Sequence, residues 1–407
     1  MYYSLTRATI WNIVGYTYLI FASLISTPIL VYYLGVSQFA QYGLILATLY
    51  LVSSIDLGLP QSVVRALSRD HQFSPRRQTL WATSSQLFIL TGFASAMIAT
   101  YIVSRFATDP LVLPIVFALC LMANIIAHYS TLPQAEGHFG YFNAKTFIVG
   151  TSNTLVAGYL SWIGQGVPII LLALLGSYVL TLAPLAYFSL KFFPRPRDGR
   201  SSLSVAKSLI IFGLKNQAGK LVGQLQSQYG KYLLVALSPL TLSAYVISQG
   251  IVQKLVGGVA QVATAFYPTA ARSGMSTQAR RLYLRLQFGL FILGIMAICL
   301  YQLFGFQFLT WWLKDTVLVA TIHSFVLVYR YYGLLLLLTP LTSAVIDASG
   351  HPGATSIFGT LAFVIELCLA FILLPHYGLL ALAYASIISL VIMLPPFFAY
   401  AHKQTIS

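Results

Sequence analysis

Seven ionisable side chains lie inside stretches that are otherwise long and apolar. Five are cations and two are carboxylates: Lys215, Lys220, Lys231, Lys254, Arg330, Asp56 and Glu366. An ionisable group at the centre of a bilayer costs about 2.5–3.5 kcal/mol on insertion scales, so each is expected to face a partner or a hydrated cavity. Ammonium and guanidinium groups that face low-dielectric walls suit phosphate and diphosphate. The pattern therefore predicts a cavity that accepts an anion and not a cationic drug.

The stretch 208–236 carries the densest set of polar groups. On a helix of about 100° per residue, seven of them fall within an arc of about 120°. They are Asn216, Gln217, Lys220, Gln224, Ser227, Gln228 and Lys231. Ser, Asn and Gln can also serve as hydrogen-bonding contacts between membrane helices. Two lysines on the same face favour a wet stripe, whereas Lys215 points away from it and suits packing or snorkelling.

Two further stretches repeat this pattern more weakly. The stretch 240–267 places Gln249, Gln253, Gly257, Gln261 and Thr264 on one side, with Lys254 at the margin. The stretch 10–33 places Thr9, Asn12, Tyr16, Ser23 and Thr27 on one narrow face. Polar stripes on the first helices of both halves predict a hydrated cleft between the two halves of the chain.

Three of the charged residues allow a structural reading as well as a functional one. Arg330 and Glu366 each lie about thirteen residues into their stretches, so both reach the membrane midplane at about 1.5 Å per residue. They could form an ion pair with each other. Asp56 could pair with a lysine across the cleft, or it could bind a coupling proton or sodium ion. The sequence leaves these alternatives open.

The elements that position these groups are membrane helices. Of 407 residues, 58% are hydrophobic and 8% are charged, and the mean hydropathy is +0.81, which no water-soluble domain approaches. Apolar runs of about 20 residues, long enough to span a bilayer, follow one another with short breaks. They fall near 10–33, 42–64, 80–104, 111–132, 146–164, 167–190, 208–236, 240–267, 284–305, 317–341, 354–374 and 379–401. The fold class is therefore an all-α membrane protein of about twelve transmembrane helices.

The breaks between these runs carry an uneven distribution of basic residues. One face of the membrane receives Arg7, Arg65, Arg69, Arg76, Arg77, Lys145, Lys191, Arg195, Arg197, Arg200, Lys207, Arg272, Arg280, Arg281, Arg285 and Lys403. The other face receives only Arg105 and Lys314. The positive-inside rule then places both termini in the cytoplasm, as an even number of spans requires. The net charge of +15 is explained by orientation and anionic lipid, and nucleic acid is not expected as a partner.

The chain divides into two related halves. The break Pro194-Arg-Pro-Arg-Asp-Gly-Arg-Ser-Ser reads as a cytoplasmic linker, which gives lobes at 1–193 and 207–407 around a linker at 194–206. The hexapeptide at 135–140, Ala-Glu-Gly-His-Phe-Gly, returns 213 residues later as Ala-Ser-Gly-His-Pro-Gly. Both copies follow the fourth span of their lobe. Two six-helix repeats around a central cavity, as in many transporters, are therefore predicted.

Several classes of chemistry find no support in the sequence. No GxxxxGK[ST] motif is present, so direct ATP hydrolysis is not expected. The histidines and the three cysteines lack metal-ligand spacing, so no metal or other cofactor is predicted. A membrane polysaccharide polymerase or ligase would place its catalytic residues in a large outward-facing loop, and none is long enough. The chain is therefore not expected to be an enzyme.

Short motifs along nearly the whole chain resemble one family. They are Asn12-Ile-Val-Gly, Pro28-Ile-Leu-Val-Tyr-Tyr-Leu-Gly35, Phe39-Ala-Gln-Tyr-Gly43, Asp56-Leu-Gly-Leu-Pro-Gln-Ser-Val-Val-Arg65, Ala244-Tyr, Pro268, Ala348-Ser-Gly-His-Pro-Gly353 and Tyr377-Gly-Leu-Leu-Ala-Leu-Ala383. In order and position they look like the Wzx-type polysaccharide flippases of the multidrug/oligosaccharidyl-lipid/polysaccharide (MOP) exporter superfamily. The resemblance implies alternating access in the bacterial inner membrane. It also implies the substrate, an oligosaccharide repeat unit linked through diphosphate to undecaprenol, for O-antigen or related polysaccharide synthesis.

The resemblance also suggests roles for the polar groups. The diphosphate would meet Lys220, Lys231, Lys254 and Arg330. The sugar would meet Asn12, Tyr16, Asn216, Gln224, Gln228 and Gln253. Asp56 and Glu366 remain for coupling to H+ or Na+, and a polysaccharide polymerase and a chain-length regulator are the implied protein partners. A multidrug exporter of the same fold is the alternative, although the first span lacks the acidic residue of the sodium-coupled drug antiporters.

Overall fold

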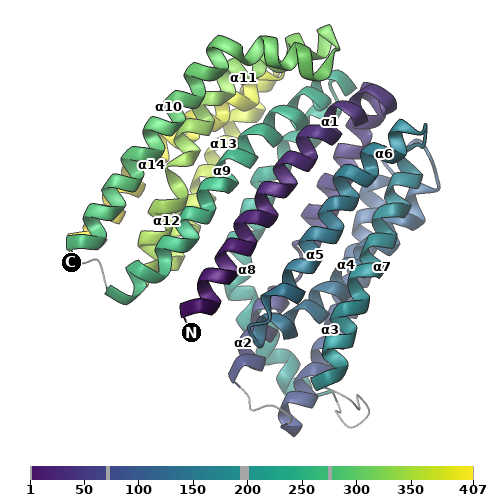
Figure 1. The fold of residues 1–407 in the computed structure, drawn as a ribbon, viewed down its shortest axis with the longest axis vertical. Coiled ribbons are helices and arrows are strands. Elements are labelled where there is room, and N and C mark those ends of the chain that lie inside the picture. The colour runs from purple at the N-terminus through teal and green to yellow at the C-terminus, as the bar shows by residue number, and fades with distance from the viewer. Residues whose placement is uncertain (1, 70–73, 193–200, 274–276, 407) are drawn as a thin grey trace. The chain divides into compact units, whose positions relative to one another are not determined.

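The protein is helical throughout the part of the chain that the structure describes. The computed structural model describes residues 2–69, 74–192, 201–273 and 277–406, and in some helical stretches, among them 2–16, 215–216 and 264–273, the side chains are not described. Within those ranges the elements are helices without a strand (Figure 1). Each of the twelve predicted spans coincides with a helix or with a pair of helices in sequence. The prediction of an all-α membrane fold of about twelve spans is confirmed.

The chain forms two compact units, residues 1–228 and 229–407. The first unit contains α1 (Tyr2–Ser53), α2 (Leu59–Arg69), α3 (Pro75–Val103), α4 (Val112–Ala135), α5 (Phe139–Thr151), η1 (Ser152–Val156), α6 (Ala157–Trp162), α7 (Val167–Phe192) and the larger part of α8 (Leu203–Val235). The second contains the end of α8 and then α9 (Pro239–Ser273), α10 (Thr277–Leu313), α11 (Thr316–Leu337), α12 (Thr339–Ala348), α13 (Pro352–Tyr377) and α14 (Leu380–Ile406). Most of the predicted linker at 194–206 lies outside the described residues.

Eight helical stretches of the described residues are long and apolar enough to cross a membrane. One of them, within α1, covers most of the first predicted span and the start of the second, because the helix is interrupted at Gly35, where φ is 74° and ψ is 161°. The fifth predicted span runs through a π-helical turn, η1, between α5 and α6. The seventh and eighth, on α8 and α9, carry the lysines and glutamines that lower their hydropathy. Their composition therefore fits a helix with one wet side and not one surrounded by lipid.

The first unit is held by an apolar core at the junction of five helices. α3 packs against α4, and α4 packs against α7 (Figure 1). Side chains from α2, α3, α4, α7 and α8 meet in one buried cluster: Leu59, Val63, Leu67, Leu80, Trp81, Phe88, Leu132, Phe188 and Leu209. Leu209 brings α8 into this cluster. The first half of α8 is therefore fixed to the first unit by apolar burial.

A buried ion pair lies close to the same core. The Arg77 side chain on α3 is 2% exposed, and its Nη2 donates to Oε1 of Glu136, which follows α4 and is 13% exposed. Ser74 caps α3 by accepting from the Arg77 backbone N–H at 3.1 Å. The pair therefore joins the N-terminal end of α3 to the C-terminal end of α4.

Replacing Arg77 is expected to destabilise the protein strongly. Arg77→Leu leaves the Glu136 carboxylate in a largely buried place without its cation, which costs about 3–5 kcal/mol for pairs of this kind. The melting temperature of the detergent-purified protein measures the effect. Lys191→Leu removes an exposed cation in the last turn of α7 and is expected to change the melting temperature little. Equal melting temperatures for the two variants would show that the pair does not stabilise the fold.

The second unit is organised around α11. α9, α10 and α14 each pack against α11, and α13 packs against α14. Large apolar side chains of α11, including Ile322 and Phe325, are fully buried in these contacts. The unit therefore has a core of its own, with α11 at its centre.

The duplicated hexapeptide forms the same turn in both units. α4 ends at Ala135 and α12 ends at Ala348, and each is followed by a glycine of positive φ, 75° at Gly137 and 89° at Gly350. The histidine N–H of each copy bonds the carbonyl five residues back, at 2.8 Å for His138 and 3.2 Å for His351. This six-to-one bond with a left-handed glycine is the Schellman ending of a helix. The two sequence copies therefore specify the same helix-to-helix connection.

Candidate functional site

The second predicted span is broken in its middle. α1 ends at Ser53 and α2 begins at Leu59, where the sequence predicted one continuous span over 42–64. The break has positive φ at two consecutive residues, 53° at Leu57 and 66° at Gly58. Asp56 stabilises it as a cap, since its Oδ1 accepts from the Gly58 N–H at 3.0 Å and its carbonyl accepts from the Leu59 N–H at 3.0 Å. Interrupted membrane helices of this kind are common at transporter binding sites.

The break lies directly against α8 through two glycines. A Cβ atom at Gly58 would lie 2.3 Å from the Gly213 carbonyl oxygen, and one at Gly213 would lie 2.1 Å from the Leu57 carbonyl oxygen. Neither position has room for a side chain. Glycine at both positions lets the two backbones touch, which brings the polar side chains of α8 within reach of the break.

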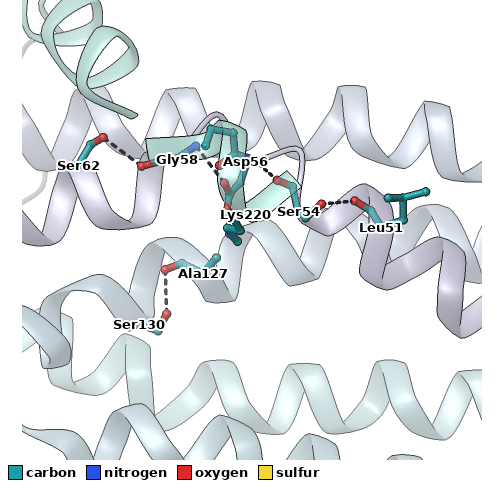
Figure 2. A network of polar contacts seen from close by, with 9 residues as sticks. Leu51, Ser54, Asp56, Gly58, Ser62, Ala127, Ser130 and Lys220 are labelled. Carbon is teal, nitrogen blue, oxygen red and sulfur yellow. Dashed lines mark hydrogen bonds and ion pairs between the residues drawn. The ribbon is translucent and has the colours of Figure 1, made fainter. Parts of the chain in front are cut away.

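One face of α8 bonds to this break, and Figure 2 shows Lys220 of this helix beside Asp56 and Gly58. Gln217 and Lys220 follow Gly213 by four and seven residues, so all three lie on the same side of the helix. Gln217 is buried and its Nε2 donates to the Ser54 carbonyl, which the interruption leaves without a helical partner. Lys220 Nζ donates to Asp56 Oδ2 at 2.7 Å. Within the stripe predicted on α8, the buried Gln217 thus bonds the backbone of the break, and Lys220 forms an ion pair with Asp56.

The two members of this ion pair differ in exposure. The Asp56 side chain is 6% exposed, whereas the Lys220 side chain is 37% exposed. The carboxylate is held by backbone and ammonium on both oxygens, and the ammonium ends a flexible four-carbon stem with two further N–H donors. Lys220 is therefore the member of the pair that can contact a ligand while Asp56 stays in place.

A second lysine contributes to the charge around the pair. Lys145 on α5 is electrostatically coupled to both Lys220 and Asp56. The group that we call the Asp56 cluster (Asp56, Lys145 and Lys220) therefore contains two basic side chains and one carboxylate. The sequence assigned Lys145 to a cytoplasmic loop. In the structure α5 begins at Phe139, so Lys145 lies within the helix. The sequence did not predict this, because the apolar run was placed at 146–164.

The remaining predicted residues of α8 and α1 have varied surroundings. Gln224 is half-buried, and Gln228 is buried and donates to Ser227 Oγ at 3.0 Å. The side chains of Asn12, Tyr16 and Asn216 lie outside the described residues. Gln228, one of the predicted sugar ligands, therefore uses one amide N–H in a hydrogen bond to Ser227 on its own helix.

The predicted cations of the second unit lie on three helices. Lys231 lies near the end of α8, Lys254 on α9 and Arg330 on α11, and all three are half-buried. Gln253, next to Lys254, is exposed. Lys220 and Lys231 are eleven residues apart on one uninterrupted helix, so they share a face of α8 three turns apart.

Arg330 and Glu366 are held by different groups. Arg330 Nη1 donates to Gln302 Oε1 at 2.6 Å on α10. Glu366 on α13 is 3% exposed, and its Oε1 accepts from Tyr229 Oη at 2.8 Å and from Ser386 Oγ at 2.6 Å. Glu366 is therefore set in a hydroxyl-lined interior, and Arg330 belongs to a separate cluster on α10 and α11.

The comparisons with known proteins relate the fold to transporters. No protein-family model and no curated protein sequence matches this chain. Among solved structures, the inward-facing form of a multidrug resistance MATE family transporter of the MOP superfamily is similar at a TM-score of 0.71 and 15% identity, over 98% of this chain and 96% of that one. An outward-facing form of such a transporter is similar at a TM-score of 0.64 and 16% identity, over 99% and 95%.

A third solved structure differs in its described pocket. It is a MOP superfamily transporter from Pyrococcus furiosus, similar at a TM-score of 0.66 and 16% identity over 98% of this chain and 96% of that one, whose binding pocket is described as having reverse polarity that suggests a different function. At such identities the likeness concerns the fold. This chain is a multi-pass membrane protein with the fold of the MOP superfamily transporters.

Proposed function

We propose that this protein is a flippase that moves a polyprenyl-diphosphate-linked oligosaccharide across the bacterial inner membrane by alternating access. The transporter fold supports the class of activity, and the Asp56 cluster supports the charge of the substrate. The observation that carries the proposal is the exposed Lys220 ammonium beside a buried carboxylate, with the second cation of Lys145 nearby. Such a group attracts an anion, and a diphosphate offers the dense negative charge that ammonium groups recognise.

In this proposal the residues predicted from the sequence divide into those that bind the diphosphate and those that bind the sugars. Lys220, Lys231, Lys254 and Arg330 would bind the diphosphate at successive positions along its path. Asn12, Tyr16, Asn216, Gln224, Gln228 and Gln253 would contact the sugars through amide and aromatic groups. O-antigen or a related surface polysaccharide is the product that such a substrate would serve, with a polysaccharide polymerase and a chain-length regulator acting on it afterwards.

Coupling to an ion follows from the same pair of charges. When a diphosphate takes the Lys220 ammonium, the Asp56 carboxylate keeps the Gly58 N–H at 3.0 Å and loses its ion-pair partner. We infer that Asp56 then offers its carboxylate to the coupling ion, H+ or Na+. Glu366, held by two hydroxyl groups, is the second candidate for such a role.

The alternative is a multidrug exporter, which the names of the solved relatives favour. The sign of the charge separates the two functions, because an excess of ammonium groups repels the cationic compounds that many drug exporters carry. We therefore expect an anionic lipid-linked substrate.

A deletion strain tests the proposal directly. The expected result is loss of surface polysaccharide, together with accumulation of a lipid-linked oligosaccharide on the cytoplasmic leaflet of the inner membrane. Restoring the gene should reverse both effects. A strain that keeps its surface polysaccharide and becomes sensitive to cationic drugs would favour the multidrug exporter instead.

Replacing Lys145 is expected to weaken substrate binding without abolishing it. A neighbouring unit charge contributes about 1–2 kcal/mol at an effective dielectric constant of about 20, so Lys145→Gln should lower the affinity for a polyprenyl diphosphate about tenfold. Binding to the purified protein in lipid nanodiscs measures the change. Lys191→Gln, at the end of α7, is the matched control and should bind as the wild type does. Equal affinities for both variants would remove Lys145 from the site.

A further inference from the structure

The Arg330 cluster is formed by two antiparallel helices of the second unit. Tyr301 and Gln302 on α10 face His323, Arg330 and Tyr331 on α11. Tyr301 Oη lies 3.2 Å from His323 Nδ1, and Arg330 Nη1 donates to Gln302 Oε1 at 2.6 Å. The guanidinium also lies over the Tyr331 ring, 5.1 Å from its centroid. The cluster thus presents one full positive charge among neutral hydrogen-bonding groups.

The charge of Arg330 is not balanced within the described part of the second unit. Its hydrogen-bond partners there, Gln302 and Tyr331, are uncharged, and no ion pair involves it. Its Nε–H is buried and finds no acceptor among the described residues. A guanidinium has five N–H donors in a rigid fork, so several remain for a ligand. A helix-to-helix contact alone would not require an unbalanced charge at such a place.

The cluster lies deep in the membrane and opens on an apolar surface. α11 begins at Thr316, so Arg330 lies about 21 Å along the helix from its outer end, well inside a hydrocarbon layer of about 30 Å. Gln302 is followed on α10 by Leu303 and Phe304, which are 62% and 61% exposed. A ligand that reaches Arg330 over such a surface is itself a lipid.

An apolar cavity adjoins the guanidinium. It has a volume of about 120 Å³ and lies among α9, α10 and α11. Its walls include Val252, Leu255, Ala297, Ile298 and Leu334, and Arg330 lines it as the one charged residue. A guanidinium at the edge of an apolar cavity matches an amphiphile, with its phosphate on the arginine and part of its chain in the cavity.

We propose that the Arg330 cluster and this cavity bind the phosphate and the adjoining isoprenoid units of a polyprenyl phosphate or diphosphate. The choice of an isoprenoid over a glycerophospholipid rests on the proposed function. At this depth the phosphate of a resident bilayer lipid would have left its interface, whereas the head group of a carrier lipid must pass the midplane during translocation. Arg330 is then a second phosphate-binding site for the carrier lipid, in addition to the Asp56 cluster of the first unit.

Photo-crosslinking in nanodiscs of phosphatidylcholine tests this site. The probe is a farnesyl phosphate that carries a diazirine, and mass spectrometry locates the label. The expected result is labelling of α10 and α11 in the full-length protein, reduced at least tenfold by Arg330→Gln and by Ala297→Phe, which fills the cavity and keeps the charge. Lys314→Gln, on the connection between the same helices, should label as the wild type does. Undecaprenyl phosphate should compete with the probe.

Two outcomes would overturn the proposal. Wild-type labelling in both Arg330→Gln and Ala297→Phe would leave Arg330 as a structural contact to Gln302. Equal competition by phosphatidylglycerol would make the site one for any anionic lipid. Because Ala297→Phe keeps the guanidinium, it tests the site even where Arg330→Gln fails to fold. If either outcome is found while the deletion strain still accumulates a lipid-linked oligosaccharide, this site is rejected and the proposed function stands.

Discussion

Removing the Lys220 ammonium is expected to abolish transport even when its partner is neutralised with it. Lys220→Gln alone leaves the carboxylate of Asp56, 6% exposed, without its ion-pair partner, which costs about 3–5 kcal/mol and lowers the amount of folded protein. The double variant Asp56→Asn, Lys220→Gln keeps two polar groups of similar shape and removes the buried carboxylate together with its partner. It should reach the membrane at nearly the wild-type level. It should still fail to export polysaccharide, because loss of a charge-assisted contact of about 2–5 kcal/mol weakens binding by about 30-fold or more.

The double variant separates a structural ion pair from a binding site. Surface polysaccharide is measured in a deletion strain that carries each variant, and membrane protein is measured in the same cells. Asp56→Asn alone keeps the ammonium and should retain substrate binding. Full export by the double variant would show that the pair only holds the broken helix in place.

Adding one methyl group at Gly213 is expected to destabilise the protein. The new Cβ would lie 2.1 Å from the Leu57 carbonyl oxygen, so the break in the second span and α8 must move apart. Overpacking costs about 1–3 kcal/mol, which outweighs the gain of about 1 kcal/mol in helix propensity from glycine to alanine. The shift also separates Lys220 from Asp56. Gly213→Ala should therefore lower both the melting temperature and substrate binding.

The same helix provides a control variant that is expected to change the melting temperature in the opposite direction. Gly223 lies ten residues further along α8, and a Cβ atom there has no neighbour within 4 Å. Gly223→Ala gains helix propensity without a clash and should raise the melting temperature slightly. If Gly213→Ala and Gly223→Ala melted alike, the two backbones would not be in contact at Gly58.

Hydropathy alone predicted the helical membrane fold, because twelve apolar runs separated by charged breaks allow little else. It did not predict the interruption at 54–58. The local signal was present, since Gly58 and Pro60 stand in the middle of the apolar run 42–64. A run of 23 apolar residues still reads as one span when hydropathy is averaged. The break became visible only through the positive φ of Leu57 and Gly58.

The candidate site was predicted in part. The polar stripe on α8 and the in-span charges identified Lys220 and Asp56, and pairing of Asp56 with a lysine was one of two alternatives. Helical periodicity gives the face of a single helix, but it gives no distance between residues 164 positions apart. Lys145 was missed because its segment looked like a loop. The similar depth of Arg330 and Glu366 allowed an ion pair between them, but depth alone could not show that they bind different partners.

Transport by the purified protein tests whether its substrate is an anionic lipid-linked sugar. The protein is reconstituted into liposomes with a fluorescent polyprenyl-diphosphate oligosaccharide, and translocation is followed by the loss of protection from a membrane-impermeant quencher. We predict that the anionic lipid-linked sugar crosses, that the Asp56→Asn, Lys220→Gln variant leaves it in place, and that a cationic dye is not moved. Movement of the cationic dye without movement of the lipid-linked sugar would contradict this prediction.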